Sequence, residues 1–160
     1  PFQGLAGAAL LTAALDRMAD AGVKVLKRSS FWETAWQPPE QAGQPSVINA
    51  VALVDPSALD AAELYQVLAA IEVSFGRDRR EKRLARTLDL DIIDFKGVVS
   101  ETNGLSLPHP RAHERAFVLA PLAELAPAWR HPVLAVTASE ALAALNEKDR
   151  GKGQEIKRLA

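Results

Sequence analysis

Apolar residues recur along the chain with two distinct periods, and these periods predict its helices and strands. Between residues 8 and 20 the apolar positions lie three and four apart (Leu11, Leu15 and Met18), which is the spacing of an amphipathic helix. A second such stripe begins behind Asp60 and Glu63, which have the separation of a capping box, and is expected to end near Gly76. Two further helices are expected over 115–125 and 139–145.

Segments with the pattern of strands lie between these helices. Residues 23–34 are expected to form a strand that bends or ends near Ser29. Residues 47–54 are apolar on both faces except for Asn49, as in a buried strand. Residues 88–93 alternate between apolar and acidic side chains, which predicts a strand with one buried face. A turn is expected over 95–98, loops over 35–46 and 101–114, and a frayed tail after the last helix.

The order of these elements indicates the fold class. Helix, strand, strand, helix and strand follow one another without the regular alternation of strand and helix that is typical of parallel sheets. No internal repeat or linker interrupts the chain. We therefore predict a single α+β domain over residues 1–160, with an antiparallel sheet.

Composition excludes several classes of protein. The chain has 160 residues, of which 48% are hydrophobic and 24% charged, as expected for a globular domain with a real core. It has no cysteine, which excludes a disulfide scaffold, a thiolate zinc site and a cysteine nucleophile. The net charge of −1 gives no general attraction to nucleic acid, and no apolar run is long enough to cross a membrane. The first residues, Pro1 to Gly4, show neither a basic region nor a cleavage motif of a signal peptide, so we expect a cytoplasmic protein.

Positive charge is nevertheless concentrated in one segment. Residues 77–86 contain six basic and two acidic side chains, a net charge of +4, so the rest of the chain sums to −5. Guanidinium groups grip phosphate oxygens in pairs and neutralise charge that develops on them. A plain charged surface loop is one interpretation of this segment, and a clamp for a small anionic ligand is the other.

Two carboxylates follow the basic segment. Asp89 and Asp91 are two positions apart in the predicted strand and therefore point to the same side, with Cα atoms about 6.6 Å apart. Neighbouring carboxylates repel each other unless a cation lies between them, and magnesium prefers such ligands together with phosphate oxygens. The alternative is the solvated face of a half-buried strand. The arginines just upstream favour a metal and phosphate site.

Other polar residues are candidates for contacts to a nucleotide or a heterocycle. His109 and Arg115 lie in a loop that could contact phosphates or a base, whereas a zinc site on His109 and His113 lacks an evident third ligand. The Asn49 amide either bonds a nearby loop or recognises the edge of a heterocycle. Glu72, beside the apolar stripe of its helix, is most simply a surface carboxylate. Because the chain lacks a Walker A sequence, an ATP site must be of another kind.

Three segments resemble a known family. They are Arg86-Thr87-Leu88-Asp89-Leu90-Asp91, Leu107-Pro108-His109-Pro110-Arg111 and residues 114–122. Together they resemble 6-hydroxymethyl-7,8-dihydropterin pyrophosphokinase of folate biosynthesis, and supporting matches extend over almost the whole chain. The resemblance implies a ferredoxin-like α+β fold, an antiparallel sheet flanked by helices. It also implies transfer of the β,γ-diphosphate of ATP to the hydroxymethyl oxygen of the pterin, with release of AMP.

The resemblance further implies roles for individual residues. Asp89 and Asp91 would bind two Mg²⁺ ions that bridge the ATP phosphates, and Arg77 and Arg86 would support the reaction. The positions that resemble ATP contacts are Glu72, Arg79, Arg83, His109 and Arg115. The positions that resemble the pterin pocket are Thr34, Asn49 and Phe117, with Phe117 stacked on the ring and Asn49 bonded to its polar edge. The partners would be ATP and 6-hydroxymethyl-7,8-dihydropterin, bound to a monomer.

The sequence departs from the family at several positions. The strand ending in Gly-Ser-Asn, which the family places before the first helix, is absent, so we expect the sheet to lack a strand through truncation or unseen residues rather than through a different fold. Leu84 stands where the family commonly has a Trp, and the loop is one residue short before Arg86. Gly104 and Val47 replace an arginine and an aromatic residue. These changes bear on loop closure, while the metal pair is intact.

Two alternative functions remain open at this point. A nucleotide-binding pseudoenzyme would keep the ATP site and lose turnover through the missing strand and the altered loop. A ferredoxin-like RNA-binding module would need exposed aromatic residues on its central strands for base stacking, and residues 47–54 and 88–93 contain none.

Overall fold

The computed structural model describes residues 2–35, 46–77, 87–102, 104–148 and 156–159. Its helices are α1 (Gly7–Asp20), α2 (Ala61–Ser74), α3 (Ala116–Leu125) and α4 (Ala138–Lys148), with a short 3-10 helix, η2 (Ala112–Glu114). Its strands are β1 (Lys24–Arg28), β2 (Trp32–Thr34), β3 (Val47–Asn49), β4 (Ala52–Asp55), β5 (Ser100–Thr102), β6 (Leu105–Leu107) and β7 (Ile156–Arg158). All four predicted helices are therefore confirmed.

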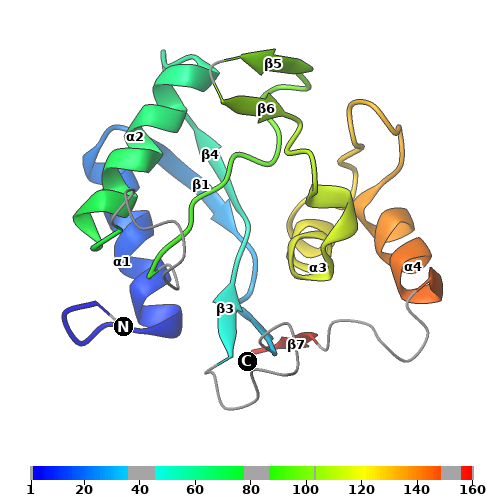
Figure 1. The fold of residues 1–160 in the computed structure, drawn as a ribbon, viewed down its shortest axis with the longest axis horizontal. Helices are drawn as coiled ribbons and strands as arrows, with labels where there is room; N and C mark the ends of the chain where they lie inside the picture. The colour runs from blue at the N-terminus through cyan, green and yellow to red at the C-terminus, as the bar shows by residue number, and fades with distance from the viewer. Residues whose placement is uncertain (1, 36–45, 78–86, 103, 149–155, 160) are drawn as a thin grey trace.

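The first two helices build most of the main core. They lie side by side in Figure 1, and Leu10 and Met18 of α1 pack with Leu64 and Leu68 of α2. The predicted capping box starts α2: the Glu63 amide donates to Asp60 Oδ1, and the Asp60 amide donates to Glu63 Oε2, both at 2.8 Å. These bonds satisfy backbone donors that the first turn of a helix leaves free, so they fix where α2 begins.

Within the described residues, the strands form three small antiparallel sheets. β1 pairs with β4, β2 lies between β3 and β7, and β5 pairs with β6. Helices and antiparallel strands together confirm the α+β class. The predicted break near Ser29 is also confirmed, because the buried Ser29 lies between β1 and β2. Its amide donates to Val51 O at 2.9 Å, and its Oγ accepts from the Val51 amide at 3.0 Å.

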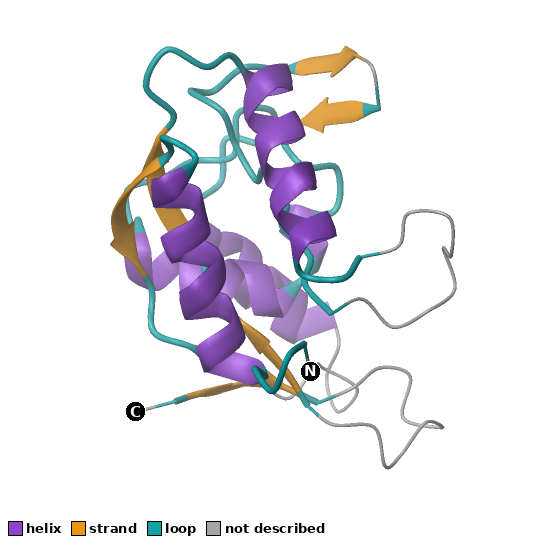
Figure 2. Cartoon of the chain, turned by 90° about the vertical axis from the view of Figure 1, so that its left-hand side faces the viewer, coloured by secondary structure: helices purple, strands orange, loops and turns teal. Residues whose placement is uncertain are grey.

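A second helix pair lies apart from α1 and α2. α3 and α4 pack on each other at the right of Figure 1, and Figure 2 shows them behind α1 and α2. Leu119 and Leu122 of α3 and Ala138 of α4 form a second core cluster. None of the helices in the described ranges combines the length and the apolarity that crossing a membrane requires.

The prediction of one buried strand over residues 47–54 is wrong. The segment divides into β3 and β4, and Val47 and Leu53 are 38% and 48% exposed. Val54 packs on the core, whereas Leu53 points away from it. The reason is that α1 and α2 cover only one face of the β1–β4 pair, so alternate side chains remain outside the core.

The prediction of a strand over residues 88–93 is also wrong. Its side chains do alternate as predicted: Leu88 and Ile92 are buried, and Asp89 and Asp91 are exposed. The segment nevertheless joins no sheet of the described residues. A cavity separates it from β4. A strand requires a ladder of backbone hydrogen bonds to a neighbour, and the bond from the His109 amide to Ile93 O at 2.9 Å does not extend into one in the part of the chain that the structure describes.

Two loop predictions are wrong in part. The predicted loop 101–114 includes β6 and η2, and the predicted frayed tail includes β7, which pairs with β2. The turn over 95–98 is confirmed by the bond from the Val98 amide to Phe95 O at 3.0 Å. The predicted loop 35–46 and the basic segment lie almost wholly outside the described residues.

Candidate active site

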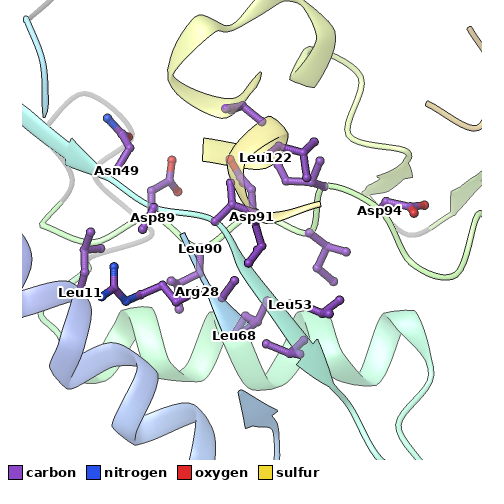
Figure 3. Close-up of a pocket in the computed structure, with 18 of the residues that line it drawn as sticks. Leu11, Arg28, Asn49, Leu53, Leu68, Asp89, Leu90, Asp91, Asp94 and Leu122 are labelled. Atoms are coloured by element: carbon purple, nitrogen blue, oxygen red, sulfur yellow. The ribbon is translucent and has the colours of Figure 1, made fainter. Parts of the chain in front are cut away.

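A cavity of about 880 Å³ lies between β3, β4 and residues 89–96 (Figure 3). Its inner wall is apolar and comes from α1 and α2, while α3 and the segment before it contribute the opposite wall. Charged and polar side chains from several of these elements also line the cavity. They are Arg28, Asn49, Asp89, Asp91, Asp94, Lys96, Arg111, Glu114 and Arg115. A volume of this size is sufficient for a substrate-sized molecule.

The two predicted carboxylates lie at this cavity. Figure 3 shows Asp89 and Asp91 on one side of their segment and Leu90 on the other. Their side chains are 40% and 43% exposed, so both can reach a ligand. Arg77 Nη1 lies 3.1 Å from Asp89 Oδ1, and His109 Nε2 lies 3.7 Å from Asp91 Oδ2. The structure therefore brings together two acidic and two basic predicted site residues.

The side chain of Glu72 contacts both the backbone between the two aspartates and the Arg77 guanidinium. It is 3% exposed, and its Oε1 accepts the Leu90 amide at 2.7 Å, while Oε2 forms an ion pair with Arg77. The interpretation of Glu72 as a surface carboxylate is therefore wrong. Burial raises the pKa of Glu72, against the opposing effects of the Leu90 amide and of Arg77. Glu72 fixes the backbone between Asp89 and Asp91 and also holds Arg77 near them.

The donor set at this place fits a hard divalent cation that shares its ligands with a substrate. Asp89 and Asp91 supply carboxylate oxygens only, which magnesium prefers over nitrogen or sulfur. No group of three or more His, Cys, Asp or Glu side chains suited to a metal occurs among the described residues. Two carboxylates leave most of the coordination sphere to water and phosphate oxygens, which is how magnesium is usually held beside nucleotides.

The histidine next to the carboxylates has a defined orientation. His109 Nδ1 accepts the Arg111 amide at 3.1 Å, so its proton is on Nε2, the atom that faces Asp91. The other predicted member of the loop pair, His113, lies against the ring of His131 at a centroid distance of 5.5 Å. The two histidines of the loop thus have different surroundings, which agrees with the weakness of the zinc hypothesis.

The predicted pterin residues lie on three different elements, β2, β3 and α3. The Asn49 amide group donates to Thr34 Oγ1 at 3.0 Å and to Val47 O at 3.4 Å, and Asn49 lines the cavity. Thr34 is 5% exposed and is not among the lining residues. Phe117, in the first turn of α3, lines the opposite wall, with the Arg115 guanidinium 5.6 Å from its ring centre.

Some residues named in the predictions lie outside the described ranges, and some residues that line the cavity were not predicted. Arg79, Arg83, Leu84 and Arg86 lie outside the described residues. The sequence analysis assigned no role to five charged residues at the cavity: Arg28, Asp94, Lys96, Arg111 and Glu114. The segments that resemble the family contain Arg111 and Glu114 and could have identified them. The other three follow no spacing that marks a site.

Comparisons with known proteins are consistent with this site. Residues 6–127 match the family described as 7,8-dihydro-6-hydroxymethylpterin-pyrophosphokinase (HPPK). Three relatives are named 2-amino-4-hydroxy-6-hydroxymethyldihydropteridine pyrophosphokinase. The Synechocystis sp. protein is 45% identical over 113 residues, 70% of this chain and 55% of that protein. The Bacillus subtilis protein is 42% identical over 105 residues, 66% of this chain and 61% of that protein. The Methylorubrum extorquens protein is 36% identical over 121 residues, 75% of this chain and 75% of that protein. The match thus spans little more than half of the Synechocystis relative.

Proposed function

This chain belongs to the 7,8-dihydro-6-hydroxymethylpterin-pyrophosphokinase family, and on that basis we propose that it is an ATP-dependent diphosphotransferase of folate biosynthesis. It transfers the β,γ-diphosphate of ATP to the hydroxymethyl oxygen of 6-hydroxymethyl-7,8-dihydropterin and releases AMP. The observation that carries this proposal is the pair Asp89 and Asp91 beside Arg77 and His109 at the edge of a substrate-sized cavity. Residues 1–160 act as one pyrophosphokinase domain.

Asp89 and Asp91 hold magnesium in this proposal, as two ions shared with the ATP phosphates. Bound there, the metal would supply positive charge that neutralises the phosphate oxygens. The exposure of both carboxylates supports this role, because neither is enclosed by the described protein. Glu72 acts below them, since its bond to the Leu90 amide holds the backbone that joins the two.

Arginines and a histidine position the phosphates. Arg77 supports transfer from its place beside Asp89, and Arg86 acts with it from the basic segment. His109 Nε2 points its proton toward Asp91 and can donate it to a phosphate oxygen nearby. The remaining ATP contacts are Arg79, Arg83 and Arg115, with Glu72 at the base of the site. Placement and charge neutralisation supply most of the catalysis in such transfers.

The pterin is bound between β3 and α3. Phe117 stacks on the ring from the α3 side, and Asn49 bonds the polar edge from the β3 side. Because the Asn49 NH₂ group already donates to Thr34 and Val47, its Oδ1 is the atom left to accept an N–H of the heterocycle. Thr34 acts indirectly in this arrangement, since it holds the Asn49 amide in place.

The proposal includes a ferredoxin-like arrangement of the sheet. The cavity that separates β4 from residues 88–93 lies between two extended segments. One further strand placed along the apolar wall of α1 and α2 would pair with β4 on one side and with residues 88–93 on the other, in one antiparallel sheet. It would leave the part of the cavity between Asn49 and Phe117 to the substrate.

The experiment that tests the function is an assay of AMP release. Protein incubated with ATP, magnesium and 6-hydroxymethyl-7,8-dihydropterin should release AMP and form one pterin diphosphate for each AMP. The reaction should stop when magnesium is chelated. Binding of ATP and of the pterin without release of AMP would contradict the proposal and indicate the pseudoenzyme instead.

A further inference from the structure

Outside the cavity, one carboxylate accepts hydrogen bonds from β2, from the loop before β2 and from β7. Glu124, near the end of α3, accepts the Ser30 amide at 3.0 Å and the Ser30 hydroxyl at 2.8 Å on Oε1. Its Oε2 accepts the indole N–H of Trp32 at 3.0 Å. Arg158 of β7 lies 3.3 Å from Oε1 and also donates to Ser30 Oγ at 2.9 Å. We call these four residues the Glu124 cluster.

The cluster connects α3 to β2, and β2 is adjacent to the strand that carries Asn49. Trp32 is the register partner of Asn49 on one side and of Arg158 on the other. Two residues further along β2, Thr34 holds the Asn49 amide through its hydroxyl at 3.0 Å. A shift of β2 relative to α3 would therefore move Asn49 as well.

The same carboxylate also fixes the rotation of α3. Phe117 and Glu124 are seven residues apart in one helix, so they lie on nearly the same face, about 10 Å apart along the axis. A helix held at Glu124 cannot turn about its axis without redirecting Phe117. Glu124 is thus coupled to both walls of the proposed pterin site, although it does not line the cavity.

The surroundings of Glu124 favour its charged form. Desolvation alone would raise its pKa, but the bonds from Ser30 and Trp32 and the positive charge of Arg158 bring the pKa of Glu124 below its ordinary value. Hydrogen bonds to a charged acceptor are stronger than neutral ones, and four donor atoms at one carboxylate restrict it in several directions. The cluster is therefore suited to holding elements in a fixed relation.

We propose that Glu124 is a positioning residue that sets the spacing between Asn49 on β3 and Phe117 on α3, and so determines how well the site accepts a flat heterocycle. This inference rests on the proposed function for the identity of the heterocycle. The linkage of α3 to β2 and β3 does not depend on that identity. The two parts can therefore be tested separately.

The test compares Glu124→Gln and Trp32→Phe with Glu140→Gln. Glu140 is a matched control, because it is also a hydrogen-bonded carboxylate beside an arginine, but it lies on α4 and does not line the cavity. Trp32→Phe keeps an aromatic ring and removes only the N–H donor, so it serves if Glu124→Gln fails to fold. Binding of 6-hydroxymethylpterin and of a non-hydrolysable ATP analogue is measured by calorimetry for each variant.

We expect both cluster variants to weaken pterin binding roughly tenfold, the cost of about one charge-assisted hydrogen bond, and ATP-analogue binding by less than about twofold. Glu140→Gln should change neither. An equal loss of both ligands, or no loss of pterin binding in either cluster variant, would overturn the inference.

Amide hydrogen exchange without ligands tests the linkage itself. Exchange over residues 32–34 and 47–49 should accelerate in Glu124→Gln and Trp32→Phe, and should be unchanged in Glu140→Gln. If wild-type protein does not bind the pterin, the proposed function fails while this measurement still decides the linkage. Unchanged exchange in the cluster variants would overturn the inference even if the protein is an active pyrophosphokinase.

Discussion

Arg77 lies 3.1 Å from Asp89, and it also forms an ion pair with the buried Glu72. A single guanidinium thus connects a carboxylate that is closed to solvent with one that is open to it. The closed carboxylate fixes the arginine and the Leu90 amide, and the open one remains accessible to a cation. This relationship suggests which residues act on substrate and which act through their neighbours, and the following predictions separate the two.

Replacement of either open carboxylate should stop the reaction and leave the fold intact. Asp89→Asn and Asp91→Asn each remove a metal ligand and also relieve repulsion between neighbouring carboxylates. We expect AMP release to fall at least about a hundredfold, while the free energy of unfolding does not decrease by more than about 0.5 kcal/mol. Asp20→Asn is the control, since Asp20 is an exposed helix residue that pairs only with the nearby Arg17 among the described residues. Normal turnover in either variant would refute the metal assignment.

Replacement of Glu72 should reduce both stability and turnover. Glu72→Gln keeps an oxygen that can accept the Leu90 amide but loses the ion pair with Arg77. Because this carboxylate is buried, we expect a loss of about 1–3 kcal/mol in the free energy of unfolding in urea. Turnover should fall because Arg77 is no longer held beside Asp89. A variant that loses activity with full stability would instead indicate direct contact with substrate.

Asn49 should matter for the pterin far more than for ATP. Asn49→Ala removes the one predicted acceptor at the polar edge of the heterocycle, and a neutral hydrogen bond contributes about 0.5–1.5 kcal/mol. Pterin binding should weaken by roughly two- to tenfold, as measured by calorimetry, with little change for the ATP analogue. Asn146→Ala, on the exposed side of α4, provides an amide control. Equal weakening of both ligands would indicate a purely structural amide.

The His131 ring should make stability depend on pH. Burial lowers the pKa of His131 below its ordinary value of 6.5, and the nearby His113 lowers it further, whereas Asp94 acts in the opposite direction. The folded chain then binds this proton less readily than the unfolded chain does, so stability is complete above pH 6.5 and decreases as the pH falls below it. Urea unfolding at pH 7.5 and pH 5.5 measures this loss.

The matched variant for this measurement is His131→Asn. His131 Nδ1 accepts the amides of Val133 and Leu134 at 3.2 Å, and an Asn oxygen can take over these bonds without titrating. The loss of stability between the two pH values should therefore be smaller in the variant. An identical loss in both proteins would show that His131 does not cause it.

Local signals in the sequence predicted the helices well. The capping box at Asp60 and the apolar stripes depend on neighbours within one or two turns, and the structure contains them where they were expected. The strands were predicted less well, because a strand depends on a partner that can lie far away in the chain. Residues 88–93 have a clear alternation and still form no strand, and Ile156 to Arg158 have none and do form one.

The candidate site, too, was predicted where it depends on local spacing and not where it depends on distant packing. The spacing of Asp89 and Asp91 predicted two carboxylates on one side of the segment, and Figure 3 shows that arrangement. The burial of Glu72 could not be predicted, because it results from packing of α2 against the Leu90 segment, and a charge beside an apolar stripe is compatible with either surface or interior. The sequence around Glu124 gave no sign of its role, because its partners come from distant segments: β2, the loop before β2, and β7.

The pairing of β2 with β7 also has a kinetic consequence. Trp32 and Arg158 are register partners although 126 positions separate them in the chain, and closing a loop of that length costs conformational entropy that only later contacts repay. We therefore expect this contact to form late in folding, after the local helices. Changes that weaken β7 should accelerate unfolding much more than they slow folding, so this short strand determines how long the folded state persists rather than how quickly it is reached.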